Sequence, residues 1–69
     1  MDKAEHLAWA KERALEYLPD VSQASASFIS DLNKHDDLRG HPVVELFGME
    51  MFAGTLNEPE CRRLIEGTH

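Results

Sequence analysis

Apolar residues recur along the chain at the three- and four-residue spacing of a helix, and they form four segments separated by proline, glycine or asparagine. An Asp or Asn precedes three of these segments, with a Glu or Gln three residues later, which is the pattern of a capping box. The predicted helices cover about residues 3–18, 21–34, 43–53 and 58–66. The expected fold is therefore all-α: a compact bundle of about four short helices in a single domain, residues 1–69.

The first segment has one apolar face. At about 100° per residue, its core side is expected to carry Ala4, Leu7, Ala8, Ala14, Leu15 and Leu18. Lys11 falls within that face, where its stem can lie on the core while the ammonium group reaches the edge. Trp9 falls on the opposite, polar face and is expected to be at least partly exposed; its neighbours there are Glu5, Glu12, Arg13 and Glu16.

The second and fourth segments have clearer apolar and polar sides. In the second, the side expected to face the core carries Val21, Ala24, Phe28, Ile29 and Leu32. The side expected to face solvent carries Ser22, Gln23, Ser27, Ser30 and Asp31. In the fourth, the arginines are expected to point outward and the apolar residues inward: Cys61, Leu64 and Ile65. Cys61 is therefore expected to be a buried, inert thiol.

The third segment, residues 43–53, is apolar nearly all round. A helix of this kind is usually buried on more than one side, so we expect it either to be the central helix or to share a face with a second chain. Glycine costs about 1 kcal/mol against alanine inside a helix, and at Gly48 the expected compensation is close approach of the second helix. The segment also holds a group that is either core or an adaptable binding surface: Phe47, Met49, Met51 and Phe52.

The connector between the second and third segments concentrates ionisable side chains. His35, His41 and Glu45 have the spacing His-x5-His-x3-Glu and form a conceivable ligand set for a divalent metal, to which Asp36 and Asp37 would add oxygen ligands. The structural alternatives are helix-end roles, with His41 as a cap, and a polar link among the three residues that fixes the loop. Histidines at helix ends commonly have no metal, so no metal or cofactor is expected.

Thirteen acidic against seven basic residues give a net charge of −6. This charge repels phosphate backbones, so nucleic-acid binding is disfavoured. It favours a basic partner surface, or it serves solubility alone. A further alternative is acidic mimicry of nucleic acid against a host enzyme, although the acids are interleaved with lysine and arginine.

Several classes of protein find no support in the residues. Cys61 is the only cysteine, which excludes an internal disulfide and a thiolate zinc cluster within one chain. The sequence has no glycine-rich phosphate loop, nucleophile elbow or helical metalloprotease motif, so no enzyme is expected. No apolar run approaches the roughly 20 residues of a membrane span, and acids stand where a signal peptide carries positive charge. We expect a cytoplasmic protein without membrane contact.

Four stretches resemble, in this order, a family of small uncharacterised proteins encoded by tailed phages and prophages of actinobacteria: HLAWAKERALEYL (6–18), SDLNKH (30–35), GHPVVEL (40–46) and RRLIEG (62–67). The resemblance covers most of the chain. It implies a setting, the host bacterial cytoplasm during infection, and no catalytic mechanism. On this resemblance the family's recurring positions are Trp9, Lys11, Arg13, His35, Gly40, His41, Glu45, Arg63 and Gly67.

The favoured interpretation is a non-enzymatic helical module that binds a host or phage protein, with a homodimer as one of its forms. Tryptophan and arginine are enriched at binding hot spots. The expected contact face is therefore Trp9 and Arg13 surrounded by Glu5, Glu12 and Glu16. In the alternative, Trp9 and Arg13 stack on each other within the chain as a cation–π pair.

Overall fold

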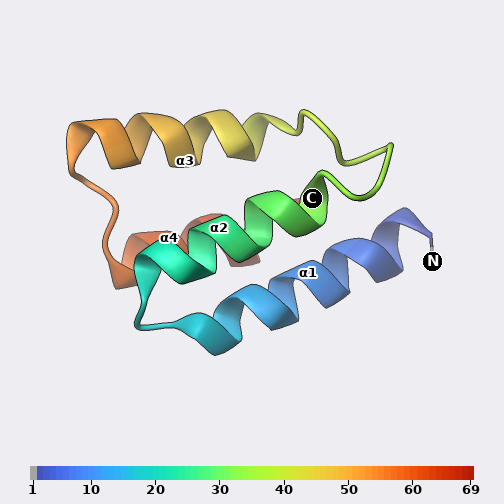
Figure 1. Cartoon of the computed structure of the whole chain (residues 1–69), viewed down its shortest axis with the longest axis horizontal. Coiled ribbons are helices and arrows are strands. Elements are labelled where there is room, and N and C mark those ends of the chain that lie inside the picture. Colours follow the sequence, from blue (N-terminus) through green and yellow to red (C-terminus); the bar gives the residue numbers. More distant parts are fainter. Residues whose placement is uncertain (1) are drawn as a thin grey trace.

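Four α-helices make up the regular structure of residues 2–69, the part of the chain that the computed structural model describes (Figure 1). The helices are α1 (Lys3–Tyr17), α2 (Val21–Leu32), α3 (Pro42–Ala53) and α4 (Glu58–Glu66). No strand occurs within these residues, and the predicted all-α bundle is confirmed. None of the four helices combines the length and the apolar character needed to cross a lipid bilayer.

Side-chain caps explain where the helices begin. The three predicted caps are confirmed by hydrogen bonds of 2.8, 3.0 and 3.0 Å from the backbone N–H groups of Glu5, Gln23 and Glu60 to the side chains of Asp2, Asp20 and Asn57. A histidine caps α3 instead, because His41 Nδ1 accepts from the N–H of Val43 at 3.0 Å. The second helix is shorter than expected: it ends at Leu32, and residues 33–40 form turns and a bend.

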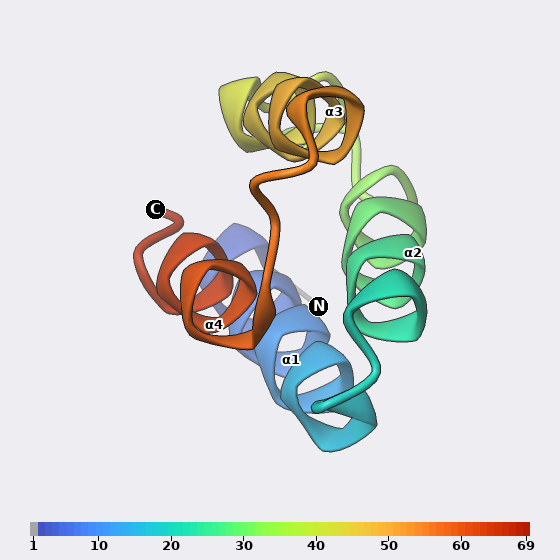
Figure 2. The ribbon, with the colours of Figure 1, turned by 90° about the vertical axis from the view of Figure 1, so that its left-hand side faces the viewer.

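The helices are unequal in how much of them is covered. α1 and α2 pack along each other, α4 lies beside them, and α3 lies on the opposite side of the molecule from α1 (Figure 2). α3 buries only Val43 and Phe47. The expectation that this helix is central is therefore wrong: the connector carries α3 to the outside, where only one of its apolar faces meets the other helices.

The core lies between the helices and takes one residue from the connector. Its buried apolar residues are Leu7, Ala10, Ala14, Ala24, Phe28, Leu32, Leu38, Val43, Phe47, Cys61, Leu64 and Ile65. The rings of Phe28 and Phe47 meet edge to face with their centroids 6.0 Å apart, an arrangement that aromatic quadrupoles favour. This contact joins α2 to α3, and Leu38 anchors the connector in the same core.

The core side of α1 is rotated from the predicted face toward Ala10. Ala4 and Ala8 are exposed, whereas Ala10 is fully buried together with Leu7 and Ala14. Alanine is only weakly apolar, so periodicity could not decide which alanines a neighbouring helix would cover. Ala10 and Ala14 have small side chains, so they leave room for the neighbouring helices at this point.

Two further expectations concern single residues. The half-buried Lys11 sends its ammonium group to the edge, where it donates to the carbonyl of Glu66 at the end of α4, 3.1 Å away. That expectation is confirmed, and a cation suits a helix carboxyl end. Gly48 does not approach another backbone: among the described residues, no neighbouring atom lies within 4 Å of where its Cβ would be. The expected close approach is wrong because Gly48 lies on the exposed side of α3.

Candidate functional site

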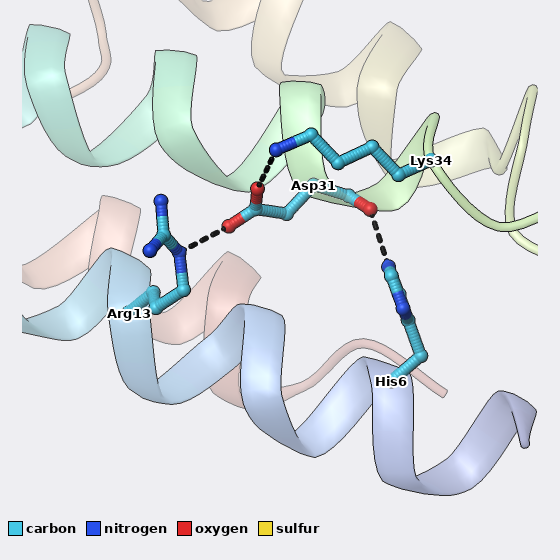
Figure 3. Close-up of polar contacts among 4 residues, drawn as sticks. All are labelled: His6, Arg13, Asp31 and Lys34. Atoms are coloured by element: carbon cyan, nitrogen blue, oxygen red, sulfur yellow. Dashed lines mark hydrogen bonds and ion pairs between the residues drawn. The ribbon is translucent and has the colours of Figure 1, made fainter. Parts of the chain in front are cut away.

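Asp31 is a buried carboxylate that links α1 to α2 (Figure 3). One of its oxygens accepts from Arg13 Nε at 2.8 Å, and the other accepts from Lys34 Nζ at 3.0 Å. The ring of His6 donates from Nε2 to the Asp31 carbonyl at 2.6 Å. The expectation that Asp31 faces solvent is wrong, because these three donors compensate the loss of water around a residue that is only 1% exposed.

Trp9 belongs to the same contact between α1 and α2. It is half-buried and packs on the edge of the core. The Arg13 guanidinium lies 4.9 Å from the centre of its ring and the Lys34 ammonium 5.9 Å, while the His6 ring is 5.1 Å away. The cation–π pairing of Trp9 with Arg13 is confirmed. Trp9 is partly exposed as expected, but its placement opposite the core is wrong.

The contacts of Arg13 are directed into the chain. The hydrogen bond to Asp31, with the carboxylate charge behind it, raises the pKa of the guanidinium, which holds Arg13 firmly in its charged form. Partner binding at Trp9 and Arg13 stays a prediction. Glu5, Glu12 and Glu16 are exposed on that face, the Arg13 side chain is 45% exposed, and Trp9 is half-buried.

Within residues 2–69, the connector does not bring together the conceivable metal ligand set. His41 uses Nδ1 to cap α3 and donates from Nε2 to the carbonyl of His69 at 2.7 Å. The other histidine, His35, accepts the N–H of Asp37 at 3.1 Å. No three His, Cys, Asp or Glu side chains of residues 2–69 are placed to hold a metal ion. In the part of the chain that the structure describes, His35, His41 and Glu45 are thus not brought together, and His41 is confirmed as a cap.

Cys61 is fully buried, as predicted. Its Sγ lies 3.7 Å from the hydroxyl oxygen of Ser25, a second buried polar residue of α2. Burial raises the pKa of the thiol, and this outweighs the hydrogen bond to Ser25. The thiolate needed for nucleophilic chemistry is therefore disfavoured.

Large apolar side chains of α3 face solvent. Phe52 is 96% exposed, Met49 67%, and Leu46 45%. These three residues are three apart, so they follow one side of the helix, and Glu45 lies on the same side one turn before Met49. We call these four residues the α3 outer face. Met51 is also 47% exposed, but it lies on nearly the opposite side of the helix from Met49.

A hollow of about 370 Å³ lies beside the carboxyl end of α3, and it is lined by Val21, Ser22, Glu50, Met51, Gly54 and Leu56. Glu50 is half-buried there, and its burial, together with the neighbouring Glu60 carboxyl, raises the pKa of Glu50. Glu60 is itself paired with Arg63, which lowers the pKa of Glu60. Within residues 2–69, no lysine or arginine forms an ion pair with Glu50.

Comparisons with protein-family models, with curated proteins and with solved structures found no match to this chain. The candidate surfaces are thus defined by the contacts of the chain itself. The sequence brought out the methionines and phenylalanines of α3 but not the side on which they are exposed. It missed Asp31 and Glu50, for which the only signal was an acidic residue close to an otherwise apolar stripe.

Proposed function

We propose that this protein is a non-enzymatic interaction module that binds another protein through the α3 outer face. The observation that carries the proposal is the exposure of Phe52, at 96%, in one row with Met49 and Leu46. Contiguous apolar surface of this kind is an interaction site more often than an accident of folding.

The position of the row supports an interface rather than a misplaced core. Phe47 and Val43 on the other side of α3 already supply the helix with buried anchors. Phe52 and Met49 therefore contribute little to folding and lower solubility, a cost that binding would offset. Methionine adapts its shape to a partner, and phenylalanine contributes on the order of 150–250 Å² of contact.

The resemblance noted above suggests where the partner occurs. If the chain is a phage protein, the partner is a host or phage protein in the bacterial cytoplasm. The α1 surface around Glu12 and Glu16 is a second candidate contact, but its most apolar member, Trp9, is half-buried and lies against Arg13 and His6. We therefore place the main contact on α3.

Affinity capture from an actinobacterial lysate tests the proposal, with wild type beside Phe52→Ala. The matched control is Tyr17→Ala, since Tyr17 is an exposed aromatic residue, 43% exposed, on a different helix. A partner should be retained by wild type and Tyr17→Ala and should lose roughly tenfold or more of its affinity for Phe52→Ala. Circular dichroism of each variant checks that helicity is unchanged.

Two results would count against the proposal. Retention of the partner by Phe52→Ala, with loss on Glu12→Gln or Glu16→Gln, would move the contact to α1. The proposal would also fail if wild type captured no protein above the background of an inert surface. The lysate concentration must be high enough to detect micromolar binding.

A further inference from the structure

We propose that the segment received by the α3 outer face is a basic amphipathic helix, whose apolar row lies on Leu46, Met49 and Phe52 and whose lysine or arginine side chains reach Glu45 and Glu50. This inference rests on the proposed function and specifies the chemistry of the partner. It combines the shape of the exposed row, the charge of α3, and the hollow beside Glu50.

The shape of the row fits a helix. Leu46, Met49 and Phe52 are each three residues apart, so they form a ridge that is inclined to the axis of a helix of 12 residues. From Leu46 to Phe52 this ridge rises about 9 Å along the axis. Ridges of this spacing pack into the grooves of another helix. An amphipathic helix laid along a helical surface is also a common mode of peptide recognition.

The charge of α3 has one sign. Glu45 and Glu50 are its only charged residues. The nearest basic residue that influences Glu50 is Arg63 on α4, which is already held by both carboxylate oxygens of Glu60. A partner with basic residues would therefore meet carboxylates that lack a cation of their own, and like-charged partners would be rejected.

The hollow gives a basic side chain a place to go. Its volume of about 370 Å³ exceeds that of an arginine side chain, and Glu50 lines it. Glu50 also lies one helical turn after Leu46, so the hollow borders the outer face at that residue. A long side chain can lay its methylene stem along Met51 and bring its charge to Glu50.

A second copy of the chain fits this face less well. If two α3 helices paired antiparallel about Met49, each Glu45 would meet Ala53 of the other copy, at the negative end of that helix dipole. In a parallel pair, the two Glu45 side chains would face each other. Each copy also carries a net charge of −6. Both registers therefore place negative charge against negative charge.

The test uses two synthetic amphipathic helices as probes, one of leucine and lysine and one of leucine and glutamate, titrated calorimetrically into the full chain. We expect the lysine peptide to bind wild type and the glutamate peptide to bind at least about tenfold more weakly. Glu50→Gln and Glu45→Gln should each weaken the lysine peptide by roughly threefold to tenfold. Asp37→Asn, which removes the same charge from the exposed connector, should stay within about twofold.

The controls separate failure of this inference from failure of the proposed function. Equal binding of both peptides, lost in Phe52→Ser, would overturn the basic preference and leave the docking face intact. If Glu50→Gln and Asp37→Asn weakened binding equally, the effect would come from net charge alone, and the inference would be overturned. Lysine-peptide binding that survives Phe52→Ser would contradict both. A dimer in sedimentation velocity that Phe52→Ser dissociates would identify a second copy as the occupant and overturn the basic helix.

Discussion

Asp31 and Glu50 are both carboxyl residues with restricted access to water, but their surroundings differ. Asp31 has a cation on each oxygen and a histidine on its carbonyl. Glu50 has a second carboxyl residue, Glu60, as its neighbour, and that residue holds the arginine. The first arrangement stabilises the fold, whereas in the second the Glu50 carboxylate has no cation paired with it among the described residues.

Replacing Arg13 with methionine should destabilise the fold. The variant leaves the buried Asp31 carboxylate with Lys34 as its only cation and removes the cation over the Trp9 ring. Because Arg13 is itself 45% exposed, we expect a loss of about 1–3 kcal/mol rather than the full cost of a deeply buried pair. Urea unfolding at neutral pH measures the free energy of unfolding.

The control for this prediction is Arg62→Met. Arg62 pairs with Glu58 at 3.7 Å, and both side chains are nearly half exposed. Such a pair contributes about 0–1 kcal/mol. Equal destabilisation by the two variants would show that the Asp31 cluster does not bind α1 to α2.

Glu50→Gln should raise stability at neutral pH. The pKa of Glu50 is raised in the folded chain above its ordinary value of 4.5, so between the two values the folded state holds more protons than the unfolded state. The free energy of unfolding therefore falls as pH rises between the two pKa values. Above the higher value, the full destabilisation by the ionised Glu50 is present. The melting temperature of Glu50→Gln should be higher than that of wild type at pH 7, and the difference should shrink below pH about 4.5.

Glu45→Gln serves as the matched variant, because it removes the same charge from the exposed side of the same helix. Glu45 lies in the first turn of α3, where a negative charge is favourable. Glu45→Gln should therefore lower the free energy of unfolding slightly at pH 7. If Glu50→Gln melted like Glu45→Gln at both pH values, burial of Glu50 would not be the cause.

At the scale of the helices, sequence signals located the starts accurately because each start depends on a few adjacent residues. Asp2, Asp20 and Asn57 cap the helices that they were expected to cap. The sequence could not decide which side of a helix faces the core when its apolar residues do not form one narrow face. In α3 nearly every direction is apolar, so the buried side was set by tertiary contacts such as that of Phe47 with Phe28.

The two glycines of this region should respond in opposite ways to alanine. Gly48 lies inside α3 with open space around it, so Gly48→Ala should add about 0.5–1 kcal/mol of stability. Gly54 ends the same helix with a φ of 74°, which alanine adopts only with strain, so Gly54→Ala should cost about 1 kcal/mol. Melting temperatures should differ by several degrees in opposite directions. A loss of stability on Gly48→Ala would indicate that another chain approaches α3 there.

At the scale of the whole molecule, apolar residues are divided between a core and an exposed face on one helix. The all-α class followed from periodicity, but the outer position of α3 did not, because it depends on how the turns of residues 33–40 direct the chain. The sequence predicted the residue types of the candidate site, but it did not predict on which side of α3 they are exposed. Trp9, the expected hot spot, lies against the chain's own cations, and partner binding there stays a prediction.

Two phenylalanines of α3 should separate folding from binding. Phe47 is fully buried and Phe52 is 96% exposed. Phe47→Leu should cost about 1–2 kcal/mol because it leaves a void beside Phe28. Phe52→Ser should change the free energy of unfolding by no more than about 0.5 kcal/mol. Urea unfolding of both variants checks this, and a large loss in Phe52→Ser would mean that this residue is part of the fold.

Attachment of α3 through Val43 and Phe47 makes it the first helix expected to open. The α1–α2 pair, clamped by Asp31, would stay folded during such an opening. Hydrogen–deuterium exchange should then be fastest in α3, at an opening free energy below that of global unfolding. A ligand on the outer face would slow this exchange by trapping the closed form. Protection of α3 amides would thus report binding even when the overall structure does not change.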